Sequence, residues 1–316
     1  MKLLLPSPLE QLHPPLQLLF LLGIILFSAS IGVALLQLIL SVTNIDIATI
    51  DWKHISKYEV NVMRWVQGIS AIFTFVLPAL LYAYLQRHNW SYLSFRSQNV
   101  LVLLFLTTII TLCLMASGNW LMELNQQLDL PATFDSLEKA MRAAEDQAAE
   151  ATSAFLQMDS FGEFIGNLIV VAMLAALGEE LLFRGALQPT LQRWFNNNHH
   201  AAIWVAAALF SFIHFQFYGF LPRMVLGAVF GYLYYWSGNL LYPIVAHLLN
   251  NGLAVIAVYA LGVSPDAANE ADSGVPWYAS ALATVVMVFL LRVFQQYNRA
   301  ATSLAQNSAD ETFSSF

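Results

Sequence analysis

Long apolar runs recur along this 316-residue chain, and most are about as long as a helix that crosses a lipid bilayer. A helix rises about 1.5 Å per residue, so about 20 apolar residues cross a hydrocarbon layer of about 30 Å. The expected spans are residues 16–42, 62–85, 98–122, 162–187, 201–219, 221–237, 240–262 and 277–297. The sequence therefore predicts an all-α, polytopic membrane helix bundle of about eight transmembrane helices.

Composition agrees with a membrane protein and excludes an ordinary soluble one. Hydrophobic residues make up 58% of the chain and charged residues 10%, against about a quarter charged in soluble domains. The bilayer is therefore an expected partner, whereas no basic stripe indicates a nucleic-acid partner. Cys113 is the single cysteine, which excludes an intramolecular disulfide and a cysteine-based zinc site. Oligomeric state is not indicated.

Positive charges suggest an orientation. The first apolar run is too long for a cleaved signal peptide and predicts a membrane helix. The positive-inside rule then places both termini in the cytoplasm of a bacterial cell, with the chain integral to the plasma membrane. The residues that support this are Arg87, Arg96, Arg193, Arg292 and Arg299, and the loops on the other side carry Glu138, Glu145, Asp146, Glu150, Asp266, Glu270 and Asp272. The residues that oppose it are Lys53, Lys57, Lys139 and Arg142.

An alanine-rich polar segment, residues 135–157, has apolar residues at helical spacing. Its start, Asp135-x-x-Glu138, resembles a capping box. We expect an amphipathic helix on the membrane surface or over the bundle. A lid or a substrate-docking element is the alternative.

Three apolar stretches carry polar residues four positions apart, where one face of a helix presents them together. The sets are Glu179-Glu180-x-x-x-Arg184, Phe210-x-x-x-His214 and His247-x-x-x-Asn251. Ionisable groups are costly in hydrocarbon, so a segment that keeps them pairs them tightly or uses them. Together the sets predict one buried catalytic site.

The first set indicates two roles for its carboxylates. Glu180 and Arg184 are i,i+4 neighbours and can pair, while Glu179 points about 100° away. Glu179 is thus left as a candidate general base. A buried ion network that only holds helices together is the alternative, and for Glu180 and Arg184 both interpretations stay open.

The histidine sets are ambiguous when each is taken alone. A lone histidine such as His214 is often a core residue, and His247 with Asn251 also fits an interhelical clasp worth about 1 kcal/mol or less. Counting the helix rise from the span ends places Glu179, His247 and Asn251 in the cytoplasmic half of the bilayer and leaves His214 deeper.

In this order, the three sets resemble the motifs of the CPBP family, the CAAX proteases and bacteriocin-processing (Abi) proteins. Surrounding residues are similar too, in Phe183-Arg184-Gly185-Ala186-Leu187 and in the Ser237-Gly238-Asn239-Leu240 turn. The resemblance covers about residues 165–255 and implies an intramembrane endopeptidase acting on a peptide or membrane-protein substrate. By this resemblance, Glu179 would activate water with help from His214, His247 and Asn251 would stabilise the oxyanion, and Glu180, Arg184 and Phe210 would support the site.

A metal is the open point of this resemblance. The family is commonly called a metalloprotease family, and Glu179, His214 and His247 are candidate zinc ligands with water as the fourth. The chain has no His-Glu-x-x-His helix. A glutamate-activated water needs no such ligand geometry, so we favour metal-free catalysis and keep zinc as a candidate cofactor.

The chain thus divides into four parts. These are N-terminal membrane helices with an extracytoplasmic amphipathic segment (1–160), a CPBP-like catalytic helix core (161–262), a loop with the last membrane helix (263–300) and a disordered tail (301–316). Alternative functions are a non-catalytic immunity or scaffold membrane protein of the same fold, or a proton-coupled transporter. No residue identifies the substrate, prenylated or otherwise.

Overall fold

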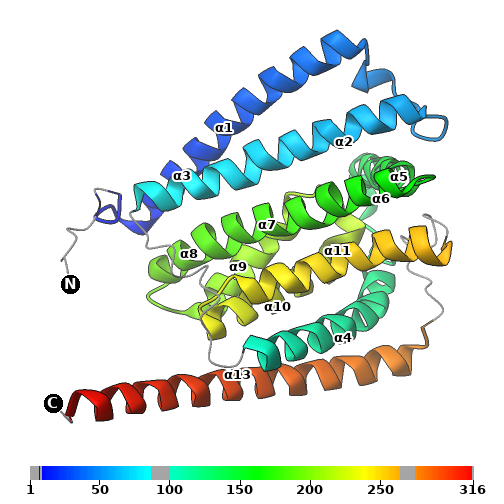
Figure 1. Ribbon diagram of the computed structural model, residues 1–316. Helices are drawn as coiled ribbons and strands as arrows, with labels where there is room; N and C mark the ends of the chain where they lie inside the picture. The colour runs from blue at the N-terminus through cyan, green and yellow to red at the C-terminus, as the bar shows by residue number, and fades with distance from the viewer. Residues whose placement is uncertain (1–6, 8, 87–99, 264–274, 315–316) are drawn as a thin grey trace.

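The computed structural model describes residues 7, 9–86, 100–263 and 275–314 and folds them into helices (Figure 1). No strand occurs in these residues, so the all-α prediction is confirmed. The loop charges Arg87, Arg96, Asp266, Glu270 and Asp272 lie outside the described residues. The main helices are α1 (Pro14–Thr43), α2 (Lys57–Ala71), α3 (Leu77–Leu85), α4 (Val100–Gln126), α5 (Asp135–Leu156), α6 (Phe161–Asn167), α7 (Ala175–Glu180), α8 (Gln188–Trp194), α9 (His199–Phe212), α10 (Phe220–Ser237), α11 (Leu241–Leu261) and α13 (Trp277–Ser314).

Within the described residues, six helical segments are long and apolar enough to cross a membrane. They are Pro14–Thr43, Lys57–Leu85, Val100–Gln126, Phe161–Trp194, Leu241–Leu261 and Trp277–Ala300. The other two expected spans correspond to α9, a shorter apolar helix, and α10, which form a hairpin through the 3-10 turn η7 (Phe217–Gly219). These helices indicate an integral membrane protein. In Figure 1, α1 begins and α13 ends at the same end of the bundle.

Three π-helical stretches interrupt the long helices close to the polar residues. They are η2 (Ile72–Val76), η5 (Leu168–Leu174) and η6 (Leu181–Leu187). The last two flank α7, which carries both glutamates, and such π-helical turns are frequent at functional sites. A β-carbon on Gly178 would lie 3.0 Å from Phe75 Cβ, so the glycine lets α7 approach η2 closely.

The hairpin of α9 and α10 is held together by a similar close approach. A β-carbon on Gly227 would lie 3.2 Å from both Ala207 Cβ and Phe210 Cδ1. Glycine therefore allows the α10 backbone to touch α9, as small residues do at membrane helix interfaces. Phe210 is fixed at this contact and is 2% exposed.

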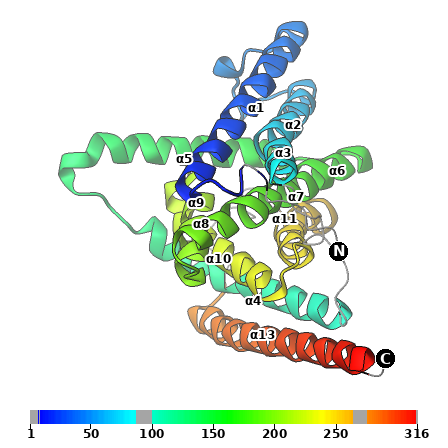
Figure 2. The same cartoon turned by 90° about the vertical axis from the view of Figure 1, so that its left-hand side faces the viewer.

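The amphipathic segment forms α5, and its helical prediction is confirmed. Figure 2 shows α5 extending sideways beyond the other helices. The capping-box prediction is wrong, because the Asp135 carboxylate binds Lys139 at 2.8 Å and Phe134 occupies the N-cap position without a side-chain cap. Capping boxes occur instead at Ser56 with Glu59 and at Ser160 with Glu163, where serine precedes the helix.

The C-terminal end differs from the expected disordered tail. The structure continues α13 as one helix through residues 301–314 to Ser314. This segment is polar, but it contains alanine, leucine and glutamine and no glycine or proline. Such a composition permits a helix to continue beyond the apolar residues that would cross the bilayer.

Candidate active site

A buried ion pair joins Glu180 to Arg184. Arg184 Nη1 donates to Glu180 Oε1 at 2.7 Å, and Nη2 donates to the carbonyl oxygen of Gly227 in α10 at 2.8 Å. Glu180 is fully buried and Arg184 is 1% exposed. The guanidinium carbon also lies 4.8 Å from the centre of the Phe210 ring. The pair expected from i,i+4 spacing is present, and it connects the α7–η6 segment to the α9–α10 hairpin.

His247 of α11 lies between the two glutamates. Its Nδ1 is 2.9 Å from Glu180 Oε1, and its Nε2 is 4.0 Å from Glu179 Oε2. A carboxylate that is paired with Arg184 accepts hydrogen bonds, so Nδ1 carries a hydrogen and donates. This bond turns Nε2 towards Glu179. The two glutamates, expected to face different directions, therefore both reach one imidazole.

Glu179 supplies a buried oxygen at the wall of a cavity. Its Oε2 has no hydrogen-bond partner among the described residues, and the whole residue is 8% exposed. The cavity has a volume of about 380 Å³ and lies between α4, α7, the end of α9, the start of α10 and α11. Its polar lining is Asn119, Glu179, His214, Arg223, His247, Asn250 and Asn251. The carboxylate thus faces a space of the size of small-ligand sites.

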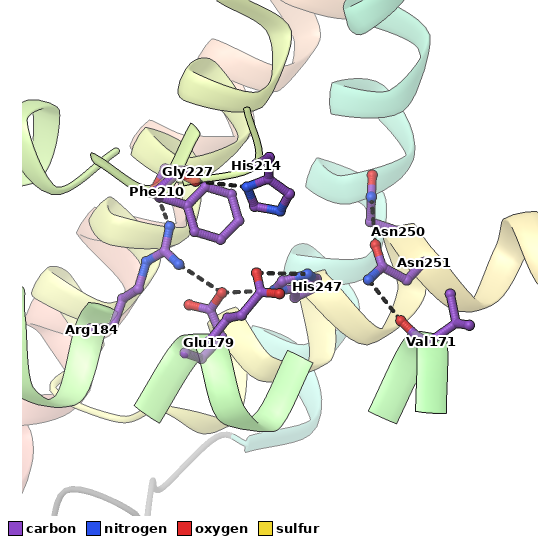
Figure 3. A network of polar contacts seen from close by, with 10 residues as sticks. Val171, Glu179, Arg184, Phe210, His214, Gly227, His247, Asn250 and Asn251 are labelled. Carbon is purple, nitrogen blue, oxygen red and sulfur yellow. Dashed lines mark hydrogen bonds and ion pairs between the residues drawn. The ribbon is translucent and has the colours of Figure 1, made fainter. Parts of the chain in front are cut away.

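His214 reaches the cavity from a break in the chain. The sequence predicts one span over 201–219, but α9 ends at Phe212 and Phe215 has φ of 53°, a left-handed conformation that ends the helix. His214 Nδ1 donates to the carbonyl oxygen of Phe210 at 2.8 Å, which leaves Nε2 as the acceptor nitrogen of the neutral ring. Figure 3 shows the rings of Phe210 and His214 above Glu179 and His247.

Asn251 is fixed by hydrogen bonds on both sides of its amide. Its Nδ2 donates to the carbonyl oxygen of Val171 in η5 at 3.1 Å, and its Oδ1 accepts from Asn250 Nδ2 at 3.1 Å. An amide nitrogen carries a second hydrogen, so Asn251 retains one donor at the cavity wall. Asn250 also lines the cavity, although its spacing from His247 predicts a packing role.

Arg223 is the main charged lining residue that lies outside the three motifs. It lies in the first turn of α10, and its Nη2 donates to Gln216 Oε1 at 2.8 Å. No partner stands four residues away to form a recognisable pair. The available signal was the charge itself, because an ionisable residue within an expected membrane span indicates function by default.

The candidate zinc ligands do not form a metal site in this arrangement. Among the described residues, no three His, Cys, Asp or Glu side chains are grouped so that they could hold a metal ion. Glu179, His214 and His247 line one cavity, and His214 Nδ1 donates to a backbone carbonyl oxygen while its Nε2 stays free of described partners. As they are placed in this structure, the three side chains are not grouped as a three-ligand zinc centre, and the catalytic steps proposed for this site do not pass through a metal.

Comparison with known proteins finds a family that is similar to the part of the chain carrying these residues. Residues 161–253 match the family described as type II CAAX prenyl endopeptidase Rce1-like. YpbD of Bacillus subtilis (strain 168) is 32% identical over 89 residues, which is 27% of this chain and 42% of that protein. The match thus covers less than half of that relative's length. No solved structure matches the chain. The matched family segment contains every site residue expected from the three motifs.

Proposed function

We propose that this chain is an intramembrane endopeptidase, because residues 161–253 match the Rce1-like CAAX endopeptidase family. It hydrolyses a peptide bond of a membrane-associated or peptide substrate through a water molecule activated by Glu179. The observation that carries this proposal is the buried Glu179 Oε2, which lacks a hydrogen-bond partner among the described residues and lines the same cavity as His214 and His247.

The first step is proton removal from water. Glu179 accepts the proton as the water oxygen attacks the carbonyl carbon of the peptide, and His214 Nε2 accepts the second water hydrogen as a hydrogen bond. His214 Nδ1 donates its hydrogen to the Phe210 carbonyl oxygen, so Nε2 of the neutral ring has a lone pair that can accept this hydrogen bond. The products of the step are a protonated Glu179 and a tetrahedral intermediate with an oxyanion.

The second step is stabilisation and collapse of that intermediate. The remaining Asn251 N–H donates to the oxyanion, and the His247 ring, held at Nδ1 by Glu180, stabilises it from the Nε2 side. Glu179 then returns its proton to the departing amine nitrogen, and the carbon–nitrogen bond breaks. Glu180 and Arg184 take no part in proton transfer and instead fix the position of the imidazole.

Glu179→Gln tests the proposal with minimal change in shape. The purified protein in detergent micelles is incubated with a peptide library, and new termini are identified by mass spectrometry. We expect Glu179→Gln to lower the cleavage rate by about 10² to 10⁴, the usual contribution of a general base. Glu123→Gln, an exposed carboxylate on α4, is the matched control and should cleave normally. Cleavage by Glu179→Gln at the wild-type rate would show that another group is the base.

A further inference from the structure

Arg223 brings a positive charge to the cavity wall without an ion-pair partner. Its described side-chain bonds are to Gln216 alone, from Nη2 to Oε1 at 2.8 Å and from Nη1 to the carbonyl oxygen at 3.5 Å. No described carboxylate lies within ion-pair distance of it, although the Glu145 and Glu179 carboxylates attract its charge from further away. Arg184, the other arginine near the cavity, has Glu180 at 2.7 Å. Arg223 therefore has unused capacity to bind an anion.

Arg64 provides a comparison, as a buried arginine whose hydrogen bonds are complete. Arg64 also lacks a carboxylate partner, but all three of its nitrogens donate to oxygens. The acceptors are Asn61, Asn167 and the carbonyls of Phe155 and Gln157. Arg64 is thus satisfied as a structural residue. Arg223 has one neighbouring residue as its acceptor and faces a cavity.

The guanidinium of Arg223 is held in place. Asn125 of α4 accepts a hydrogen bond from the Leu221 backbone and donates one to the Phe217 carbonyl oxygen, both at 2.8 Å, and so fixes the start of α10. Gly219 provides the surface beneath the guanidinium, since a β-carbon there would lie 3.1 Å from Nη2. The charge is therefore pre-positioned at the wall, which reduces the entropy cost of binding an anion.

The chemistry of the group indicates which anion it binds. A guanidinium presents its N–H donors in a planar fork that matches the two oxygens of a carboxylate. A charge withdrawn from water is costly until an opposite charge compensates it. Glu145 of α5 attracts the Arg223 charge from beyond ion-pair distance, and its Oε2 accepts from the Tyr218 backbone at 3.2 Å. Neither Glu145 nor Glu179 comes within ion-pair distance of Arg223, so its guanidinium fork stays open to a carboxylate that a substrate brings into the cavity.

We propose that Arg223 binds a carboxylate of the substrate peptide and so sets the position of the cleaved bond relative to that carboxylate. This rests on the proposed peptidase function and adds a specificity determinant to it. The carboxylate belongs to the peptide's C-terminus or to an acidic side chain. In either case the bond presented to Glu179 lies at a fixed short distance along the peptide, because both residues line the same cavity.

Binding to the Glu179→Gln variant tests this without requiring cleavage. Three fluorescent peptides of one sequence are compared by anisotropy in micelles: a C-terminal acid, a C-terminal amide, and an amide with one added internal glutamate. We expect a carboxylate-bearing peptide to bind about 10- to 100-fold more tightly than the plain amide. If the C-terminal acid binds more tightly, the ligand of Arg223 is the terminal carboxylate. If the amide with the internal glutamate binds more tightly, the ligand is an acidic side chain.

Adding Arg223→Gln should abolish this preference, and Arg223→Lys should retain part of it. Arg292→Gln removes an exposed positive charge from α13 and should leave the preference intact. If Arg223→Gln does not fold, Gln216→Ala keeps the charge but removes the acceptor of Nη2, and it should reduce the preference. Equal binding of all three peptides, or a preference that survives Arg223→Gln, would overturn the inference. Selective binding without any cleavage by the wild-type protein would count against the peptidase function alone.

Discussion

The Nδ1 atom of His247 lies 2.9 Å from Oε1 of Glu180, although 67 residues separate them in the chain. The same oxygen accepts from Arg184 at 2.7 Å. One buried carboxylate oxygen thus holds both a guanidinium and an imidazole, and it connects the α7–η6 segment to α11. A charged group that accepts two such bonds fixes both partners more firmly than a neutral amide would.

Glu180→Gln should therefore destabilise the protein strongly. It leaves the Arg184 charge buried without compensation, and breaking one partner of a buried ion pair costs about 3–5 kcal/mol. Thermal unfolding in micelles, followed by circular dichroism, measures the effect. The double variant Glu180→Gln/Arg184→Met removes both charges and should be more stable than the single variant. A double variant as unstable as Glu180→Gln would show that shape, not charge, determines the loss.

Gly178→Ala should also destabilise the protein, for a steric reason. The added β-carbon would lie 3.0 Å from Phe75 Cβ and 3.1 Å from Val76 Cγ2, and overpacking of this kind costs about 1–3 kcal/mol. Activity should fall as well, because α7 carries Glu179. The control is Gly23→Ala in α1, where an added β-carbon meets nothing within 4 Å. Equal unfolding temperatures for Gly178→Ala and Gly23→Ala would contradict the close-contact argument.

The contact between α5 and η7 should weaken as pH rises. Burial raises the pKa of the Glu145 carboxyl above its ordinary value, although the hydrogen bond from the Tyr218 backbone opposes this. A group that binds its proton more tightly in the docked state stabilises that state below its ordinary pKa and loses this contribution as pH rises through the raised pKa. Hydrogen exchange of the Tyr218 amide across that range measures docking, with Glu145→Gln as the pH-insensitive reference. Identical pH profiles for both proteins would exclude a role for Glu145.

Chelation should leave peptide cleavage unchanged. The described residues contain no group of three His, Cys, Asp or Glu side chains placed to hold a metal ion. Proton transfer through Glu179 requires no such ion. The assay compares cleavage before and after prolonged dialysis against a chelator, with metal content measured in both samples. Activity that is lost on dialysis and returns with added zinc would contradict the metal-free mechanism.

The sequence predicts those parts of this structure that depend on local spacing. Span lengths identify the long helices, and i,i+4 spacing identifies the Glu180–Arg184 pair, because both follow from the geometry of a single helix. Contacts between helices do not follow from such spacing. The direct contact of His247 with Glu180 is therefore not predicted, although Glu179 and His247 are expected in one site. The break at Phe215 likewise places His214 at the end of α9 instead of within a continuous span.

Arg223 illustrates a second limit. Arg223 has no polar residue three or four positions away, so helical spacing does not assign it to a site. Its place in the cavity becomes clear only when the first turn of α10 is packed against the other helices. Here Asn125, almost a hundred residues earlier in the chain, fixes that turn through hydrogen bonds to two backbone groups. Helical spacing in the sequence does not predict a contact between residues so far apart. The charge of Arg223 within an apolar span is the one sequence feature that indicates a function for it.

Asn251→Ala should lower kcat with little change in KM. The Asn251 amide is held by Val171 and Asn250. In the proposed mechanism its remaining N–H donates to charge that develops only in the transition state. Removal of one such donor costs about 10²- to 10³-fold in kcat. Steady-state cleavage of a defined peptide by wild type and variant separates the two constants. An increase in KM at unchanged kcat would instead indicate that Asn251 binds the substrate in its ground state.

Asn250→Ala provides the comparison that separates donation from orientation. Asn250 lines the same cavity, but its described bond is to the Asn251 oxygen, so its loss frees the Asn251 amide to rotate without removing the donor. We expect a kcat between those of wild type and Asn251→Ala, because the rotated amide still reaches the oxyanion for part of the time. A kcat for Asn250→Ala below that of Asn251→Ala would mean that Asn250 is itself the oxyanion donor, with Asn251 holding it in place through Val171.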